Sequence, residues 1–368
     1  MIIGGKFVDK NSPALIIAEA GINHDGNLDQ ALALIDMAAE AGADICKFQL
    51  FKASKLYTIA AGDMRTANGR IVDSQQLLQP VELRPEWLPT LMARCKEKNI
   101  GFLCTVCDEQ SADDLEAAGV DSYKLTSTAM THIPLHRYVA RKGKPMVFST
   151  GGGYIGDVDN VVRAIEDEGN HQLVLMHCVT KYPTPLEACN AQIIKTLQYN
   201  YPEYLIGFSD HTEDSTIAPV AAIAMGAKLI EKHITLDKTL PGADHCFAQE
   251  LEGLKAMIAA VREAERKMAA GEPIDIDPRV IGGSTRKTLN EVEQRTRSFA
   301  FRTIFTIKEM KKGDVITPEN TAVLRPGNAP RGIEPVHYTM LVEKGVRVNK
   351  DIPANTSIKW DDVLNFGE

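Results

Sequence analysis

The 368-residue sequence contains no apolar run that approaches the ~20 residues needed for a membrane-spanning helix. Its first ten residues, MIIGGKFVDK, lack the basic region and the long apolar stretch of a secretory signal. These absences argue against a membrane protein and against an exported one. We therefore expect the protein to reside in the cytoplasm.

An excess of positive charge is absent as well, and so is a disulfide framework. Acidic residues outnumber basic ones by 49 to 41, and the net charge of −8 argues against nucleic acid and anionic membranes as partners. The seven cysteines are an odd number without scaffold spacing, which fits a reducing compartment. An anionic substrate would need basic side chains gathered at one site.

The sequence does contain a regular alternation of short β-type runs with amphipathic helical stretches. The β-type runs cover residues 14–20, 44–50, 101–106, 121–126, 144–150, 173–179, 204–210 and 228–234. The clearest helical patterns cover 27–43, 84–99, 108–119, 157–169, 215–226 and 250–270. Eight β-type runs, each followed by a helix-compatible stretch, predict an α/β fold with a closed (β/α)8 TIM barrel. A doubly wound open sheet is the alternative, but no Gly-x-Gly-x-x-Gly motif follows the first run.

Polar side chains stand where these runs end, which is the face where barrel enzymes carry their active sites. They are Glu19, Asn23, His24, Lys47, Gln49, Thr105, Lys124, Ser127, Ser149, Thr150, His177, Thr180, Ser209, Asp210, His211, Glu231 and His233. Alternate residues of a strand point to the same side, so Glu231 and His233 share one face. His211 and His233 end neighbouring strands, and we expect them to lie side by side.

Two adjacent histidines admit two interpretations. Neutral imidazoles with water and oxygen ligands suit a first-row divalent ion such as Mn, Fe, Co or Zn better than Mg. With only two protein ligands, positions stay open for substrate and water. In the other interpretation, each histidine is a hydrogen-bonded barrel residue that holds no ion.

Seven motifs occur in an order and at intervals that are typical of one family. They are AEAGINHDGN (18–27), KFQ (47–49), YKLTS (123–127), STGG (149–152), HCVTKYPTP (177–185), GFSDHT (207–212) and EKHIT (231–235). On these motifs the chain resembles the sialic acid synthase family, which makes N-acetylneuraminic, legionaminic and pseudaminic acids. The resemblance implies a catalytic barrel in residues 1–270, a linker in 271–297 and a small, mostly β antifreeze-like (SAF) domain in 298–368.

The resemblance also implies a reaction. Phosphoenolpyruvate condenses with the open-chain aldehyde of an N-acylmannosamine-type sugar, water adds, and phosphate leaves through C–O cleavage. The residues expected around phosphoenolpyruvate are Lys47, Thr105, Lys124, Ser127, Ser149 and Ser209. Ammonium and hydroxyl groups are suitable donors for phosphate and carboxylate oxygens. Glu19, expected to be catalytic together with Lys47 and Lys124, matches a glutamate that could position or deprotonate the attacking water.

The same resemblance assigns the metal and the sugar side. His211 and His233 match the metal ligands of the family, and the expected ion is Mn²⁺, with Mg²⁺ or Co²⁺ as alternatives. The expected sugar contacts are Gln49, Thr180, Tyr182, Asp244 and Arg325. Arg325 corresponds to an arginine of the small domain that enters the sugar pocket of a neighbouring subunit. This implies a domain-swapped homodimer. The linker is rich in Pro, Gly and charge and could span the distance.

Two positions depart from the family pattern. Relatives often carry an acidic residue where this chain has Ala129, and an asparagine where it has Thr180. The acceptor is therefore left open between N-acetylmannosamine, its 6-phosphate and a 2,4-diamino sugar. Three rival functions also remain: a 3-deoxy-keto-acid synthase acting on another aldose, an aldolase with Lys47 or Lys124 as Schiff-base amine, and a non-enzymatic sugar-binding protein.

Overall fold

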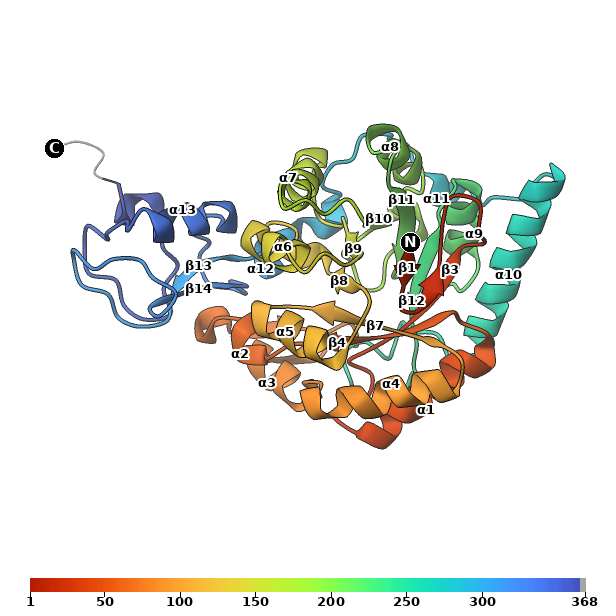
Figure 1. Cartoon of the computed structure of the whole chain (residues 1–368), viewed down its shortest axis with the longest axis horizontal. Helices are drawn as coiled ribbons and strands as arrows, with labels where there is room; N and C mark the ends of the chain where they lie inside the picture. Colours follow the sequence, from red (N-terminus) through yellow and green to blue (C-terminus); the bar gives the residue numbers. More distant parts are fainter. Residues whose placement is uncertain (365–368) are drawn as a thin grey trace.

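A closed barrel of eight parallel strands forms the centre of the molecule, as predicted (Figure 1). The computed structural model describes residues 1–364. The strands are β3 (Leu15–Gly21), β4 (Ile45–Leu50), β7 (Gly101–Val106), β8 (Tyr123–Leu125), β9 (Met146–Ser149), β10 (Leu173–Cys178), β11 (Leu205–Asp210) and β12 (Leu229–His233). They pair in chain order, and β12 pairs with β3 to close the barrel.

Helices surround the barrel and cover the outward faces of its strands. They are α1 (Leu28–Ala41), α4 (Leu88–Glu97), α5 (Glu109–Ala118), α6 (Ile133–Ala140), α7 (Ile155–Glu166), α8 (Ile193–Asn200), α9 (Ile217–Ala224) and α10 (Leu251–Ala270). Six of them overlap predicted helical stretches. The two that were not predicted, α6 and α8, are each eight residues long. Helices α1 and α5 end at Gly42 and Gly119, both in the left-handed conformation with a φ of 85°.

The barrel interior changes from apolar to charged along the strands. Its amino-terminal half is filled by Leu15, Ile17, Ile45, Leu103, Val147, Val174, Met176, Leu205 and Leu229. A short hairpin of β1 (Ile2–Ile3) and β2 (Lys6–Phe7) closes this end, and Ile3 and Val8 pack against the apolar layer. Because every second residue points inward, the positions that follow on β3 and β4 are Glu19 and Lys47.

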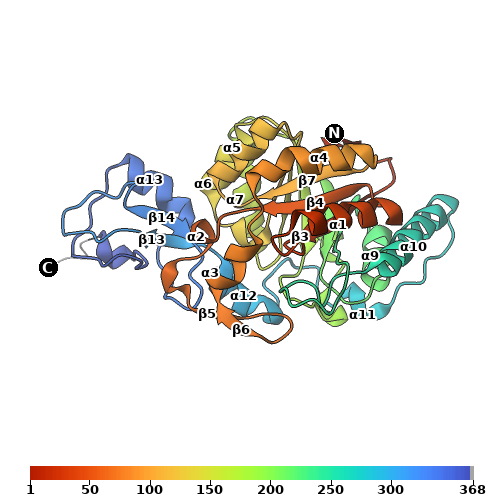
Figure 2. The same cartoon turned by 90° about the horizontal axis from the view of Figure 1, so that it is seen from below.

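A segment that showed no periodic pattern lies between β4 and α4. It forms α2 (Ala53–Leu56), a hairpin of β5 (Asp63–Arg65) and β6 (Ile71–Asp73), and α3 (Ser74–Leu78). In Figure 2 this segment lies beside α12 (Gln294–Ala300), at the same end of the molecule as the small C-terminal unit. Residues from the segment and from α12 line one cavity.

The expected linker packs against the barrel instead of extending away from it. It contains α11 (Pro278–Ile281), and Val280 and Glu293 are both buried. Beyond it, β13 (Thr303–Thr306) pairs antiparallel with β14 (Thr321–Leu324), and α13 (Tyr338–Glu343) covers a separate apolar core. Figure 1 shows this unit in blue, next to α2, α5 and α6. The boundaries at 270 and 298 stay predictions, and residues 365–368 of the predicted small domain lie outside the described residues.

None of the helices within residues 1–364 combines the length and the apolar character that a membrane crossing requires.

Gly101→Ala is expected to destabilise the protein, because the added Cβ would collide with the Gly4 carbonyl oxygen and lie 3.0 Å from Ile45 Cγ1. Overpacking of this kind costs about 1–3 kcal/mol, which urea denaturation followed by circular dichroism would measure. Gly156→Ala, in α7, is the control, since nothing lies within 4 Å of its added Cβ. Equal stability of the two variants would contradict a tightly closed barrel end.

Candidate active site

Four buried charged side chains meet at the carboxyl end of the barrel core. Lys47 Nζ lies 2.7 Å from Glu19 Oε2 and 3.6 Å from Glu231 Oε1. Lys124 Nζ lies 3.7 Å from Glu231 Oε2. All four side chains are at most 6% exposed. Two lysines and two glutamates therefore balance one another's charge. Burying either pair without the other would cost several kcal/mol.

Hydroxyl and amide groups from neighbouring strands extend this charged network. Lys47 Nζ donates to Thr105 Oγ1 (3.1 Å), and Lys124 Nζ donates to Ser149 Oγ (2.8 Å). Ser209 Oγ donates to Glu231 Oε1 (3.1 Å), and Gln49 Nε2 donates to Glu19 Oε1 (2.6 Å). Ser127 Oγ accepts from the Gly151 amide (3.0 Å). Seven predicted site residues thus form one connected set through Glu231 and these contacts: Glu19, Lys47, Gln49, Thr105, Lys124, Ser149 and Ser209. Ser127 lines the adjoining cavity.

The two carboxyl groups of the network differ in proton affinity. Burial raises the pKa of Glu19 above its ordinary value, despite the nearby Lys47. Burial acts in the same direction on Glu231, but the charges of Lys124 and Lys47 outweigh it, so the pKa of Glu231 is lowered. Glu19 is therefore the better proton acceptor of the two, as a general base requires.

The two predicted histidines do lie side by side, with ring centroids 5.4 Å apart. His211 Nδ1 donates to the Val179 carbonyl oxygen (2.9 Å), which leaves the lone pair on Nε2. His233 Nδ1 is buried and has no hydrogen-bond partner among the described residues. Burial lowers the pKa of His211 to about 4 and the pKa of His233 well below its usual range. Both rings are neutral, which is the form that binds metal ions.

These features fit a divalent ion held by two nitrogens. An imidazole nitrogen lies about 2.1 Å from such an ion, so rings with this separation can share one. The carbonyl contact of His211 is the kind of outer contact that orients a metal-binding imidazole. Within residues 1–364, no cluster of three or more His, Cys, Asp or Glu side chains is arranged to hold a metal. Metal binding by His211 and His233 stays a prediction.

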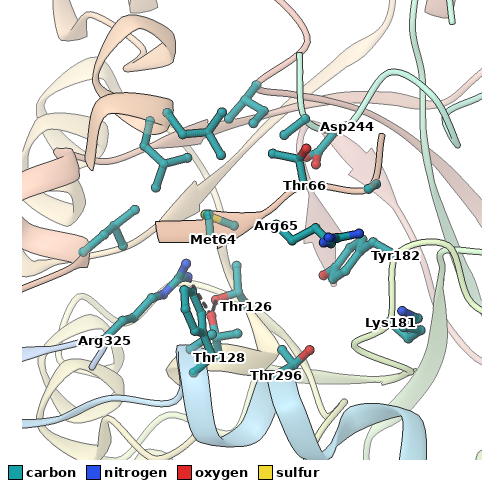
Figure 3. Close-up of a pocket in the computed structure, with 18 of the residues that line it drawn as sticks. Met64, Arg65, Thr66, Thr126, Thr128, Lys181, Tyr182, Asp244, Thr296 and Arg325 are labelled. Atoms are coloured by element: carbon teal, nitrogen blue, oxygen red, sulfur yellow. Dashed lines mark hydrogen bonds between the residues drawn. The ribbon is translucent and has the colours of Figure 1, made fainter. Parts of the chain in front are cut away.

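A cavity of about 550 Å³ adjoins the network and the histidines (Figure 3). Gln49, Tyr182, Asp244 and Arg325, all predicted to contact the sugar, line it together with His233. The Tyr182 ring lies over His211, with centroids 4.2 Å apart. Burial raises the pKa of Asp244 to about 7. The cavity has the size of a small-molecule site.

Two predicted sugar residues have contacts that differ from those expected. Thr180 is fully buried, and its amide and hydroxyl donate to Glu293 Oε1 (2.8 and 3.2 Å), so it holds the expected linker and does not line the cavity. Arg325 lies in the cavity of its own chain, where it donates to Thr128 Oγ1 (2.7 Å) and covers the Tyr57 ring. The expected supply of this arginine to a neighbouring subunit stays a prediction.

Positive charge gathers on the cavity wall, although the chain as a whole is acidic. Arg65, Lys181, Arg295 and Arg325 all line the cavity. None of them has a carboxylate within ion-pair distance in the described part of the chain. Together with the two buried lysines, they provide the local positive field that an anionic substrate needs.

Sequence reasoning gave no role to Glu231, which contacts both buried lysines. The sequence pattern could have indicated a site role for Glu231, because it lies two residues before His233 and therefore on the same face of the strand. Arg65, Thr128 and the α12 residues were missed because they come from segments without a periodic pattern.

Comparisons with known proteins agree with this geometry. The NeuB family model matches residues 34–273, and the SAF domain model matches residues 301–364. The chain is 48% identical to the spore coat polysaccharide biosynthesis protein SpsE of Bacillus subtilis, over 98% of this chain and 96% of that protein. It is 33% identical to the N,N'-diacetyllegionaminic acid synthase of Legionella pneumophila, over 95% and 94%.

Solved structures of two similar proteins share the fold of this chain. The crystal structure of Bacillus subtilis SpsE superposes with a TM-score of 0.89 at 47% identity and covers 100% of this chain and 99% of that one. The N-acetylneuraminic acid synthetase of Leptospira borgpetersenii, in complex with citrate, superposes with a TM-score of 0.64 at 30% identity and covers 73% and 89%.

Lys47→Met is expected to lower the free energy of unfolding by about 3–5 kcal/mol, because it leaves the Glu19 carboxylate buried without its cation. Lys47→Met combined with Glu19→Gln removes both charges and is expected to recover at least half of that loss. Urea denaturation at pH 7 would compare the variants. Lys255→Met, which removes a surface ion pair with Glu40, is the control, with an expected change below about 1 kcal/mol. Equal losses in the single and double variants would argue against a balanced charge network.

Proposed function

We propose that this chain, which belongs to the NeuB family and carries a SAF domain, condenses phosphoenolpyruvate with an N-acylmannosamine-type sugar aldehyde to give a nonulosonic acid and phosphate. The observation that supports this most strongly is the buried network of Lys47, Lys124, Glu19 and Glu231 beside two neutral imidazoles. Relatives named as N-acetylneuraminate-9-phosphate, legionaminic and pseudaminic acid synthases belong to the same class of condensing enzyme.

In this proposal phosphoenolpyruvate binds over the two buried lysines. Its phosphate and carboxylate oxygens accept from Lys47, Lys124 and the hydroxyls of Thr105, Ser127, Ser149 and Ser209. Charge-assisted hydrogen bonds of this kind are about twice as strong as neutral ones. The oxygens of phosphoenolpyruvate would compete with the carboxylates of Glu19 and Glu231 for hydrogen bonds from the ammonium groups of the two lysines.

The bonds change as follows. C3 of phosphoenolpyruvate attacks the aldehyde carbon, whose oxygen takes up a proton to become a hydroxyl. The oxygen of a water molecule bonds to C2, and the bond between C2 and the bridging oxygen breaks, which releases inorganic phosphate and leaves a ketone. Glu19, with its raised pKa, is placed to hold or accept the proton of that water.

His211 and His233 would hold a divalent ion, Mn²⁺ in our proposal, with Mg²⁺ or Co²⁺ as alternatives. When bound, such an ion polarises the aldehyde carbonyl and favours attack by the enol carbon. Tyr182 packs against His211 and would close this side of the acceptor pocket.

The acceptor sugar would occupy the larger cavity. Gln49, Tyr182, Asp244 and Arg325 line it and supply hydrogen-bond donors and acceptors for hydroxyl and acylamino groups. Which N-acylated sugar is used depends on these residues and on the wall formed by α12 and the β5–β6 hairpin.

A direct assay tests the proposal. The enzyme would be incubated with Mn²⁺, phosphoenolpyruvate carrying ¹⁸O at the bridging oxygen, and a panel of N-acylmannosamines, their 6-phosphates, 2,4-diamino sugars and simple aldoses. We expect one sugar class to give a 3-deoxy-2-keto acid together with ¹⁸O-labelled phosphate. Turnover with simple aldoses only would favour another keto-acid synthase. A borohydride-trapped adduct on Lys47 or Lys124, with activity that resists chelators, would favour a Schiff-base aldolase.

His211→Ala and His233→Ala are each expected to remove Mn²⁺ binding and metal-dependent turnover while leaving the fold intact. Calorimetric titration of chelator-treated protein with Mn²⁺ provides a readout that is independent of activity. His171→Ala, at an exposed position, is the control and should bind Mn²⁺ as the unmodified protein does. Unchanged Mn²⁺ affinity in both site variants would refute the ligand assignment.

Arg325→Ala is expected to raise the KM of the sugar about 10- to 100-fold, which corresponds to one lost charged hydrogen bond. The KM of phosphoenolpyruvate should change less than about threefold, because its proposed donors lie in the barrel. Steady-state kinetics with each substrate varied in turn would measure both values. An equal loss for both substrates would indicate that the small domain acts through overall assembly.

A further inference from the structure

Another buried ion pair lies in the barrel wall next to the two histidines. Lys232 Nζ lies 2.6 Å from Asp210 Oδ2, and both side chains are at most 1% exposed. The two residues face each other across neighbouring strands, because Asp210 is the partner of Lys232 in the register of β11 and β12. Neither of them is among the described residues that line the cavity. Asp210 and Lys232 are called the outer ion pair below.

Each member of the outer ion pair immediately precedes one of the two histidines. Asp210 is followed by His211 at the end of β11, and Lys232 is followed by His233 at the end of β12. Since alternate residues of a strand point to opposite faces, Lys232 points outward while Glu231 and His233 point inward. The outer ion pair therefore joins the two strand ends from which the imidazoles extend.

Lys232 also holds the turn that follows β11. Its Nζ donates to Thr212 O (2.5 Å), Thr212 Oγ1 (3.1 Å) and Asp214 O (2.8 Å). Asp210 Oδ1 accepts from the Thr212 amide (2.8 Å), and Asp210 Oδ2 accepts from the Thr212 hydroxyl (3.1 Å). The residues on both sides of His211 are thus bonded to the outer ion pair.

Two further contacts hold His211 itself. Its carbonyl oxygen accepts from the Thr184 amide (2.8 Å), and its Nδ1 donates to the Val179 carbonyl oxygen (2.9 Å). Both partners lie in the segment after β10. These contacts orient the ring relative to its main chain, and the outer ion pair fixes that main chain relative to β12.

The energetics of the outer ion pair favour a positioning role over a contribution to stability. Two charges that are buried as a pair lose their hydration, and well-packed apolar residues of similar volume are often equally stable or more stable. A fully bonded polar network, in contrast, specifies one local structure. The carbonyl oxygens of Thr212 and Asp214 reach the same ammonium group only when the turn has this conformation.

We infer that Asp210 and Lys232 are positioning residues, which hold the turn after β11 so that the His211 ring stays beside the His233 ring. Neither residue would touch the substrates or the metal ion. The inference rests on the proposed function for the ion that the two rings would hold. The placement of the His211 ring can also be measured without metal.

Lys232→Met combined with Asp210→Asn tests the inference. This double variant buries no lone charge and keeps an acceptor for the Thr212 amide, while it loses the bonds from the lysine to the turn. We expect its Kd for Mn²⁺ to rise about 10- to 100-fold, as is typical when a residue that orients a metal ligand is replaced. Calorimetric titration of chelator-treated protein would measure it. An unchanged Kd in the folded double variant would overturn the inference.

A matched pair separates positioning from stability. Lys142→Met combined with Asp113→Asn removes an ion pair of 2.6 Å between α5 and the turn after α6. Urea denaturation would show how much stability each double variant loses, and we expect the Kd for Mn²⁺ to stay unchanged in the control. A rise in Kd that equals that of the test variant would overturn the inference, because Mn²⁺ affinity would then follow stability alone.

The His211 ring provides a readout without metal. A neutral ring that donates from Nδ1 gives a characteristic long-range ¹H–¹⁵N correlation pattern, which His211→Ala would assign. We expect the double variant to lose this pattern. If the unmodified protein binds no Mn²⁺, the metal assignment in the proposed function is refuted, and this spectrum alone decides the inference. An unchanged His211 pattern would then overturn it.

Thr212→Val covers the case in which the double variant does not fold. It removes the hydroxyl that contacts both members of the outer ion pair, without a change in charge. We expect the Kd for Mn²⁺ to rise about threefold or more, which corresponds to one lost hydrogen bond. Thr196→Val in α8, whose hydroxyl donates to Thr285 O (2.6 Å), is the control and should leave the Kd unchanged. Equal Kd values in the two variants would overturn the inference.

Discussion

The chemistry-bearing end of this barrel depends on four buried charges that are stable only because they lie against one another. A single carboxylate or ammonium group in the barrel interior would cost several kcal/mol. Glu19, Lys47, Lys124 and Glu231 share that cost in one neutral group, which hydroxyls on adjacent strands complete. The lysines are therefore present and oriented before any anion arrives, which reduces the reorganisation that binding would require.

The same lysines influence the histidines. Burial is the largest cause of the lowered pKa of His233, and the charges of His211 and Lys47 add to it. Burial thus keeps both imidazoles neutral, and for His233 the nearby positive charges act in the same direction, which leaves ring lone pairs available to a metal ion. The site divides into a charged half suited to a phosphorylated enol and an adjoining neutral half suited to a carbonyl oxygen. This division matches what a carbon–carbon condensation between an anion and an aldehyde demands.

The outer wall of the site has a different origin from its floor. The floor consists of strand ends, whereas the wall is assembled from the segment after β4, the helix α12 and the loop that carries Arg325. Arg302 joins the segment after β4 to the small C-terminal unit through the carbonyl oxygens of Lys55 and Val323. Glu293, directly before α12, accepts from the amides of Gly152 and Thr180, which follow β9 and β10. Substitutions in connecting segments of this kind can change the wall without altering the floor.

The sequence by itself determined the eight strands, most helices and the polar residues at the strand ends. Alternation with a period of two and glycine stops are local signals, and parallel strands bring their carboxyl ends to one face, so Glu19, Lys47 and His233 could be grouped in advance. Tertiary structure alone decided that Thr180 contacts Glu293, that Glu231 joins both lysines, and that Arg325 lies in the cavity of its own chain. Thr180 and Arg325 depend on contacts between residues more than 100 positions apart, and no local pattern encodes which distant surface a side chain will meet.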